Sequence, residues 1–134
     1  MKEIWNAVIL LSMIFCHVVD DFYLQGILAK MKQKNWWKEN YPDQIYRQDY
    51  MVALMFHAFS WAFMTHLPLV ACMFLANRYP NVYLFFLEFL ANLLIHMAVD
   101  DEKANKHRIN LVQDQTVHLL QVTVTFLLYM YTIF

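Results

Sequence analysis

Hydrophobic residues gather in four long segments that are separated by polar connections. The segments span about residues 4–28, 50–76, 82–99 and 111–134. Each approaches or exceeds the length of about 20 residues that a helix needs to cross a hydrocarbon core of roughly 30 Å. Asn110 and Gln113 have the spacing of a capping box at the start of the fourth segment. The pattern therefore predicts an all-α, integral-membrane chain with four transmembrane helices in a single domain, 1–134.

The composition supports a membrane protein. The 134 residues are 60% hydrophobic and 16% charged, and they include a single glycine. Average soluble domains are roughly 45–50% apolar and about 25% charged, so a soluble domain of this length could not bury so much apolar surface. The formal net charge of −1 gives no basic footprint for nucleic acid. We expect membrane lipids as partners and no nucleic acid, and a homo-oligomer is compatible with this composition.

The connections predict the topology. Short connections favour antiparallel neighbours, hence an up-down-up-down four-helix bundle. The first and third connections then share one side of the membrane and carry eight of the ten Lys and Arg residues, while Lys2 and Arg78 fall on the other side. The positive-inside rule places the two basic connections in the cytoplasm and both termini outside the plasma (inner) membrane. Trp36 and Trp37, among the lysines of the first connection, indicate an anchor in the headgroup layer.

Four histidines are expected at one depth of this bundle. They lie near the ends of the first and third segments and near the starts of the second and fourth: His17, His57, His96 and His118. With a rise of about 1.5 Å per residue, all four fall within about 10 Å of the cytoplasmic face. His66 lies about 13 Å farther along the second segment, so we exclude it from the site.

A set of aspartates accompanies three of these histidines. Asp21, Asp100 and Asp114 each lie four residues from a histidine, on its cytoplasmic side. This spacing puts each pair on one helix face. Asp20 and Asp101 point about 100° away from their neighbours, and we expect them to meet water or lysines.

Such a stack of polar groups favours a metal site. A charged side chain inside a bilayer costs about 2.5–3.5 kcal/mol even on permissive scales, so such groups usually face a partner or a cavity. A divalent ion fits imidazole nitrogens and carboxylate oxygens, with zinc as the first choice and manganese or iron as alternatives. One or two ions are compatible with the set. The predicted ligands are His17, Asp21, His57, His96, Asp100 and His118.

The same motifs carry a resemblance that spans nearly the whole chain. They are HxxxDFxxQ from His17 to Gln25, His57 alone, HxxxDxxK from His96 to Lys103, and DQxxH from Asp114 to His118. The chain resembles a family of small bacterial and phage integral-membrane proteins known as a domain of unknown function. The resemblance implies a multi-pass protein with this His/Asp set and no particular activity. The chain is also loosely similar to membrane-bound metal-dependent hydrolases.

These observations favour a membrane-embedded metal-dependent hydrolase acting at the cytoplasmic leaflet on a lipid or another phosphoryl or acyl ester. We expect Asp114 as general base, with a role as metal ligand as the alternative. Lys103 would stabilise developing negative charge or extend to the headgroups. Gln25 and Gln115 would orient the ligands. Two other function classes remain open: a transporter of ions, protons or metal, and a structural or partner-binding membrane protein whose polar network fixes the bundle.

Overall fold

A computed structural model describes residues 2–133, and within them the chain is helical with no strand. The elements are α1 (Lys2–Val19), the π-helical turn η1 (Asp20–Leu24), α2 (Leu28–Met31), α3 (Lys34–Asn40), the 3₁₀ turn η2 (Gln44–Tyr46), α4 (Asp49–Ala76), α5 (Val82–Ala104) and α6 (Leu111–Ile133). The prediction of an all-α chain built on long apolar helices is confirmed. Phe134, the predicted end of the fourth segment, lies outside the described residues.

The first helical segment ends earlier than the hydrophobic pattern predicts. The apolar run continues to Leu28, but helical structure stops at Leu24 and a separate short helix, α2, follows. Gly26 lies between them at a φ of +49°. Glycine reaches this left-handed conformation without the steric cost that a Cβ brings, and it is a common residue just beyond a helix end. The predicted boundary at residue 28 is therefore wrong by one turn.

The third long helix is longer than predicted. Hydrophobicity fades at Val99, yet α5 continues to Ala104, so Asp100 and Lys103 are fixed on a helix rather than in a connection. The capping box at the start of α6 is confirmed. Gln113 N donates to Asn110 Oδ1 at 2.9 Å, and Asn110 N donates to Gln113 Oε1 at 3.0 Å.

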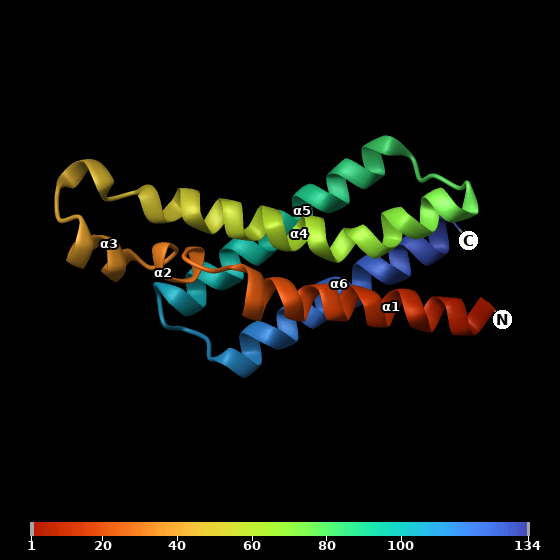
Figure 1. The fold of residues 1–134 in the computed structure, drawn as a ribbon, viewed down its shortest axis with the longest axis horizontal. Helices are drawn as coiled ribbons and strands as arrows, with labels where there is room; N and C mark the ends of the chain where they lie inside the picture. Colours follow the sequence, from red (N-terminus) through yellow and green to blue (C-terminus); the bar gives the residue numbers. More distant parts are fainter. Residues whose placement is uncertain (1, 134) are drawn as a thin grey trace.

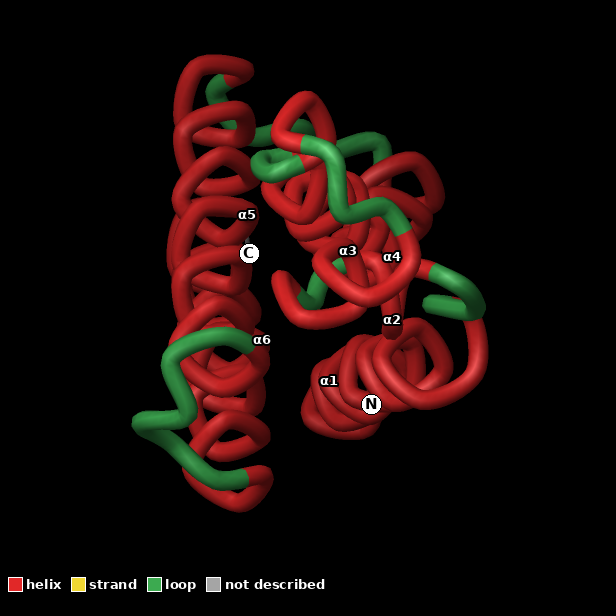
Figure 2. The backbone as a smooth tube through the Cα atoms, turned by 90° about the vertical axis from the view of Figure 1, so that its left-hand side faces the viewer, coloured by secondary structure: helices red, strands yellow, loops and turns green. Residues whose placement is uncertain are grey.

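The four long helices alternate in direction and place both chain ends at one end of the molecule (Figure 1). Figure 2 shows α1 and α4 on one side and α5 and α6 on the other. The main packing partners of α4 are α1 and α5, and those of α6 are α5 and α1, with a smaller contact between α4 and α6. The short elements α2 and α3 lie at the opposite end from the termini.

The interior divides into an apolar half and a polar half. Toward the termini, the core consists mainly of apolar side chains such as Met13, Leu69, Val122 and Phe126. Toward α2, the buried side chains are mostly histidines and aspartates. The polar half is the part of the fold that positions the candidate site.

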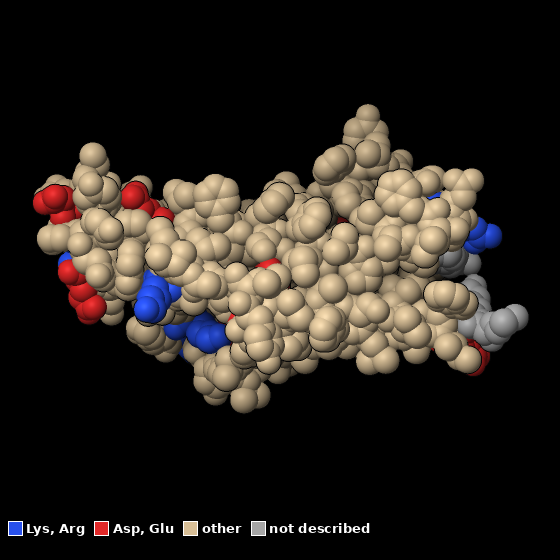
Figure 3. All heavy atoms as spheres, viewed as in Figure 1, with Lys and Arg blue, Asp and Glu red and all other residues tan. Residues whose placement is uncertain are grey.

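The outer faces of the long helices are apolar. Leu11, Phe15, Leu87 and Leu127 are each more than half exposed. Figure 3 shows most charged side chains of one face toward its two ends, with only small acidic patches in the wide band between them. Three helical stretches are long and apolar enough to cross a membrane: Glu3–Leu24, Gln44–Ala76 and Val82–Ala104. This finding supports the prediction that the chain has helices suited to crossing a membrane. The 23-residue α6 is long enough but is not one of the three.

The connection between α5 and α6 is charged and exposed. Lys106 Nζ lies 2.6 Å from Glu102 Oε1 and 3.1 Å from Asp101 Oδ2. These two carboxylates raise the pKa of Lys106. The expectation that Asp101 meets a lysine is confirmed.

Candidate metal centre

The polar half of the bundle contains a layer of seven His and Asp side chains, each 6% exposed or less. We call it the His/Asp layer; its members are His17, Asp21, His57, His96, Asp100, Asp114 and His118. Every long helix contributes at least one of them. Helical periodicity explains the arrangement, because residues four apart share a face and the polar face of each helix turns inward.

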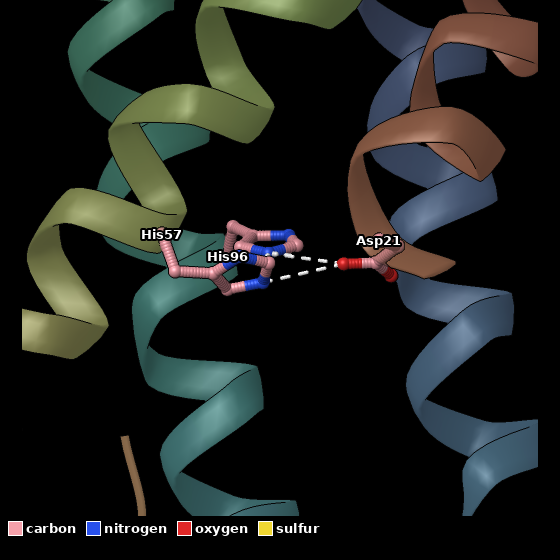
Figure 4. Close-up of side chains that lie close together, drawn as sticks. All are labelled: Asp21, His57 and His96. Atoms are coloured by element: carbon pink, nitrogen blue, oxygen red, sulfur yellow. Dashed lines mark hydrogen bonds and ion pairs between the residues drawn. The ribbon is translucent and has the colours of Figure 1, made fainter. Parts of the chain in front are cut away.

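Three of these side chains bring one ligand atom each to a common place. Asp21 Oδ1 lies 3.3 Å from His57 Nε2 and 3.9 Å from His96 Nε2, and the two histidine nitrogens are 3.1 Å apart. Figure 4 shows the carboxylate of Asp21 facing both rings. Ligand atoms that bind one zinc ion tetrahedrally, with bonds of about 2.0–2.1 Å, are about 3.4 Å apart. The Asp21–His57–His96 triangle therefore has the size of one face of such a site.

Asp100 joins this triangle to a second group. Its Oδ2 lies 3.2 Å from His57 Nε2, and its Oδ1 lies 3.5 Å from His118 Nε2. His96, Asp100 and His118 also bring ligand atoms close enough to hold an ion, and the rings of His96 and His118 lie 4.0 Å apart. The two groups share His96, so both describe one continuous set of ligands.

His17 lies beside these groups rather than within either. Its Nδ1 accepts a hydrogen bond of 2.7 Å from the indole of Trp61, and its Nε2 lies 3.1 Å from Gln115 Oε1. Both ring nitrogens thus have partners other than an ion. The geometry suits His17 to positioning Trp61 and Gln115.

Asp114 is buried and held from two directions. Lys103 Nζ donates to Asp114 Oδ2 at 2.6 Å, and Gln115 Nε2 donates to the same oxygen at 3.0 Å. The other carboxylate oxygen, Oδ1, lies 3.4 Å from His118 Nε2 and has no hydrogen-bond partner among the described residues. Asp114 therefore keeps one oxygen available at the edge of the ligand set.

The two glutamines expected near the site differ in position. Gln115 links three members of the layer, because its side chain also donates to Asp21 Oδ2 at 2.9 Å in addition to its contacts with His17 and Asp114. Gln25 follows η1, and its Oε1 makes no hydrogen bond within the described part of the chain. The structure thus gives Gln115 hydrogen bonds to the layer and leaves the buried Oε1 of Gln25 without one.

The layer has partners that the sequence pattern does not identify. Lys32 Nζ donates to Asp100 Oδ2 at 2.6 Å, although Lys32 belongs to the connection expected at the headgroups. Trp61 stacks on His96 with ring centroids 4.3 Å apart. Trp61 follows His57 by four residues, so the shared helix face could have predicted that Trp61 lies near the layer. No comparable spacing predicts the position of Lys32.

The expectation for Asp20 is wrong. Asp20 is 1% exposed and accepts a hydrogen bond of 2.6 Å from Ser60 Oγ. A π-helical turn begins at Asp20, and its wider turn changes the angle between successive side chains. Asp20 and Asp21 can therefore both face the interior, where an α-helix would separate them by about 100°.

His66 lies outside the His/Asp layer. Its Nδ1 is 2.7 Å from the backbone oxygen of Ala62, and its ring packs on Phe89 with centroids 5.3 Å apart. It occupies the half of the bundle nearer the termini, one helical turn beyond Ala62.

Comparisons with protein families, with curated proteins and with solved structures find no match for this chain.

Proposed function

We propose that the four long helices form a membrane-spanning bundle whose His/Asp layer binds one divalent metal ion, and that the chain is a metal-dependent hydrolase. The observation that carries the proposal is the Asp21–His57–His96 triangle, with sides of 3.1, 3.3 and 3.9 Å. Asp100 is the best fourth ligand, since its Oδ2 lies 3.2 Å from His57 Nε2.

Unpartnered atoms in the layer support a bound cation. His118 Nε2 is buried and makes no hydrogen bond within the described residues, although two carboxylate oxygens lie 3.4 and 3.5 Å away. A buried polar group without a partner costs roughly 1–3 kcal/mol. A cation near these atoms offsets that cost for the nitrogen and the carboxylates together.

Formal charge favours a single divalent ion. With neutral histidines, the buried carboxylates Asp20, Asp21, Asp100 and Asp114 face two ammonium groups, Lys32 and Lys103. The remainder is a formal charge of −2, which one divalent ion balances. Uncompensated charge in a medium of low dielectric is costly. The mixed nitrogen and oxygen ligands favour zinc, with manganese and iron as alternatives.

The surrounding residues suit hydrolysis of an ester. A divalent ion held by Asp21, His57, His96 and Asp100 would supply Lewis acidity toward water and toward an ester or phosphoryl oxygen. Asp114 Oδ1 is placed to accept a proton from water at the edge of the site. Lys103 is 34% exposed, so its ammonium can turn from Asp114 to an anionic substrate and release the second oxygen of the base. The substrate is then a lipid or another ester at the cytoplasmic leaflet, the side that the basic connections favour.

Metal content tests the proposal most directly. The protein, purified in detergent with a tag that lacks histidine, should contain about one divalent ion per chain by elemental analysis. His96→Ala should abolish binding because both ligand groups use His96. His66→Ala is the matched control: it removes an equally buried imidazole and should leave the metal in place. Absence of metal from the unmodified protein after supplementation would leave the layer as a structural polar network.

A transporter is the second candidate, and one specific observation favours it. Buried polar side chains continue from the layer toward the termini. His118 Nδ1 lies 3.3 Å from Gln121 Oε1, Gln121 Nε2 donates to the Asn92 side chain at 3.2 Å, and Asn92 Nδ2 donates to Thr125 at 2.7 Å. Polar groups at membrane depth often mark ion paths. Zinc flux into liposomes that Asn92→Leu abolishes, with metal content retained, would favour transport over hydrolysis.

A further inference from the structure

A pocket of about 380 Å³ lies between α3 and the start of α4, at the end of the molecule that carries the first connection. Its basic lining residues are Lys34, Lys38 and Arg47, and the lining also includes one carboxylate, Asp43. The pocket therefore has an excess of positive charge in the segment expected at the headgroup layer.

The aromatic residues of the pocket pack against one another. Trp37 is buried, and its indole donates to the backbone oxygen of Met31 at 2.6 Å. Trp37 stacks on Tyr46 at an angle of 17°, and Tyr41 packs on Tyr46 with centroids 5.4 Å apart. Because these rings pack against one another, they form one wall of the pocket. They do not surround a cavity, as the aromatic cage that binds a quaternary ammonium group does.

Hydrogen bonds attach the pocket to the bundle. Lys34 N donates to Asn105 Oδ1 at 2.7 Å, and Asn105 Nδ2 donates to the backbone oxygen of Lys32 at 3.0 Å. The Lys34 ammonium lies 4.7 Å from the centre of the Tyr50 ring. Asn105, the residue that follows α5, therefore fixes the backbone at the start of α3, from which Lys34 extends into the pocket.

We propose that this pocket binds a phosphate group, as carried by the headgroup of an anionic membrane lipid or by free phosphate. Three basic side chains attract an anion and repel a cation, and each basic residue near a membrane surface contributes about 1 kcal/mol toward anionic lipid. The pocket lies at the end of the apolar helices, where headgroups are found. Tyr50, one of its lining residues, precedes His57 by seven residues on α4, a rise of about 10 Å. The pocket needs no metal, so it can be tested separately from the proposed hydrolysis.

Native mass spectrometry of the detergent-solubilised protein tests the pocket with three probes: short-chain phosphatidic acid, phosphatidylcholine with the same chains, and inorganic phosphate. We expect one retained phosphatidic acid per chain and weaker retention of phosphatidylcholine. Competition by inorganic phosphate would identify the phosphate alone as the ligand, whereas binding without competition would identify the lipid headgroup.

The variant Lys38→Gln/Arg47→Gln should bind phosphatidic acid about 25-fold more weakly, from about fivefold for each basic residue removed. The matched control Lys30→Gln/Arg108→Gln removes the same charge from exposed positions that do not line the pocket, and it should bind like the unmodified protein. Both variants should retain the circular dichroism of the unmodified chain. Equal retention of the two lipids, or equal weakening in both variants, would overturn the proposal.

Discussion

The ligand set and the general base can be separated at single residues. Asp114→Asn should retain about one metal ion per chain, because Asp114 lies at the edge of the ligand set and outside both metal-compatible groups. It should lose most hydrolytic activity, since general-base catalysis typically contributes about 10²–10⁴-fold. Metal content and turnover measured on the same preparation decide between the roles. Loss of metal would identify Asp114 as a ligand.

Lys32 should contribute most to thermal stability when the protein contains no metal. Its ammonium is the closest cation to Asp100, so Lys32→Gln leaves a buried carboxylate without that partner. Breaking a buried pair costs about 3–5 kcal/mol, and less here because the lysine is partly exposed. We expect a lower thermal midpoint without metal and a larger rise on adding zinc than in the unmodified protein. Lys30→Gln, from the same connection, should change neither; an unchanged metal-free midpoint in Lys32→Gln would contradict this role.

The sequence predicted the depth of the histidines and aspartates in the bundle better than it predicted which other residues contact them. The spacing of four residues between His96 and Asp100 fixes a shared face whatever the tertiary structure, so their neighbourhood could be inferred. The Lys32–Asp100 ion pair and the Trp61–His17 hydrogen bond join separate elements. They depend on how helices pack, and no local spacing encodes that packing.

Among the elements, the turn at Gly26 is the clearest position for a stability measurement. Gly26→Val should lower stability by about 1–2 kcal/mol, because a branched side chain is strained at positive φ. A Cβ there would meet no atom closer than 3.8 Å, so the added Cβ itself has room and the backbone conformation is the expected source of the cost. Gly26→Asn should cost less, since asparagine tolerates this conformation. Thermal unfolding followed by circular dichroism compares the two; equal midpoints would exclude a backbone origin.

The helices themselves were easier to predict than their ends. Long apolar runs identify all four, but hydropathy marks where an apolar run ends and not where the helix ends. This explains why α5 continues five residues past Val99 through polar residues that remain helical. The π-helical turn at Asp20 changes which side chains face inward. No feature of the amino-acid composition predicts this turn.

For the whole molecule, the asymmetry of basic residues predicts orientation. In a background without Cys16 and Cys72, a cysteine at Gln33 should resist a membrane-impermeant reagent in intact cells, and one at Tyr79 should react. Both positions are exposed and lie in different connections. Lysing the cells should make Gln33→Cys react, which controls for accessibility. The reverse pattern in intact cells would place the His/Asp layer at the outer face.

For the proposed membrane-spanning bundle, the matching polar faces of α5 and α6 bear on how the chain would enter a bilayer during synthesis. Glu88, Asn92, His96 and Asp100 recur every four residues on α5. On α6, Thr125 accepts a hydrogen bond from Asn92, and His118 lies beside His96 and Asp100. A translocon that released either helix alone would leave these groups facing lipid, at a cost of several kcal/mol. Insertion as a hairpin avoids that intermediate. Glycosylation mapping in microsomes should show α6 inserting efficiently when α5 precedes it and poorly behind an unrelated helix; equal insertion in both contexts would refute this order of events.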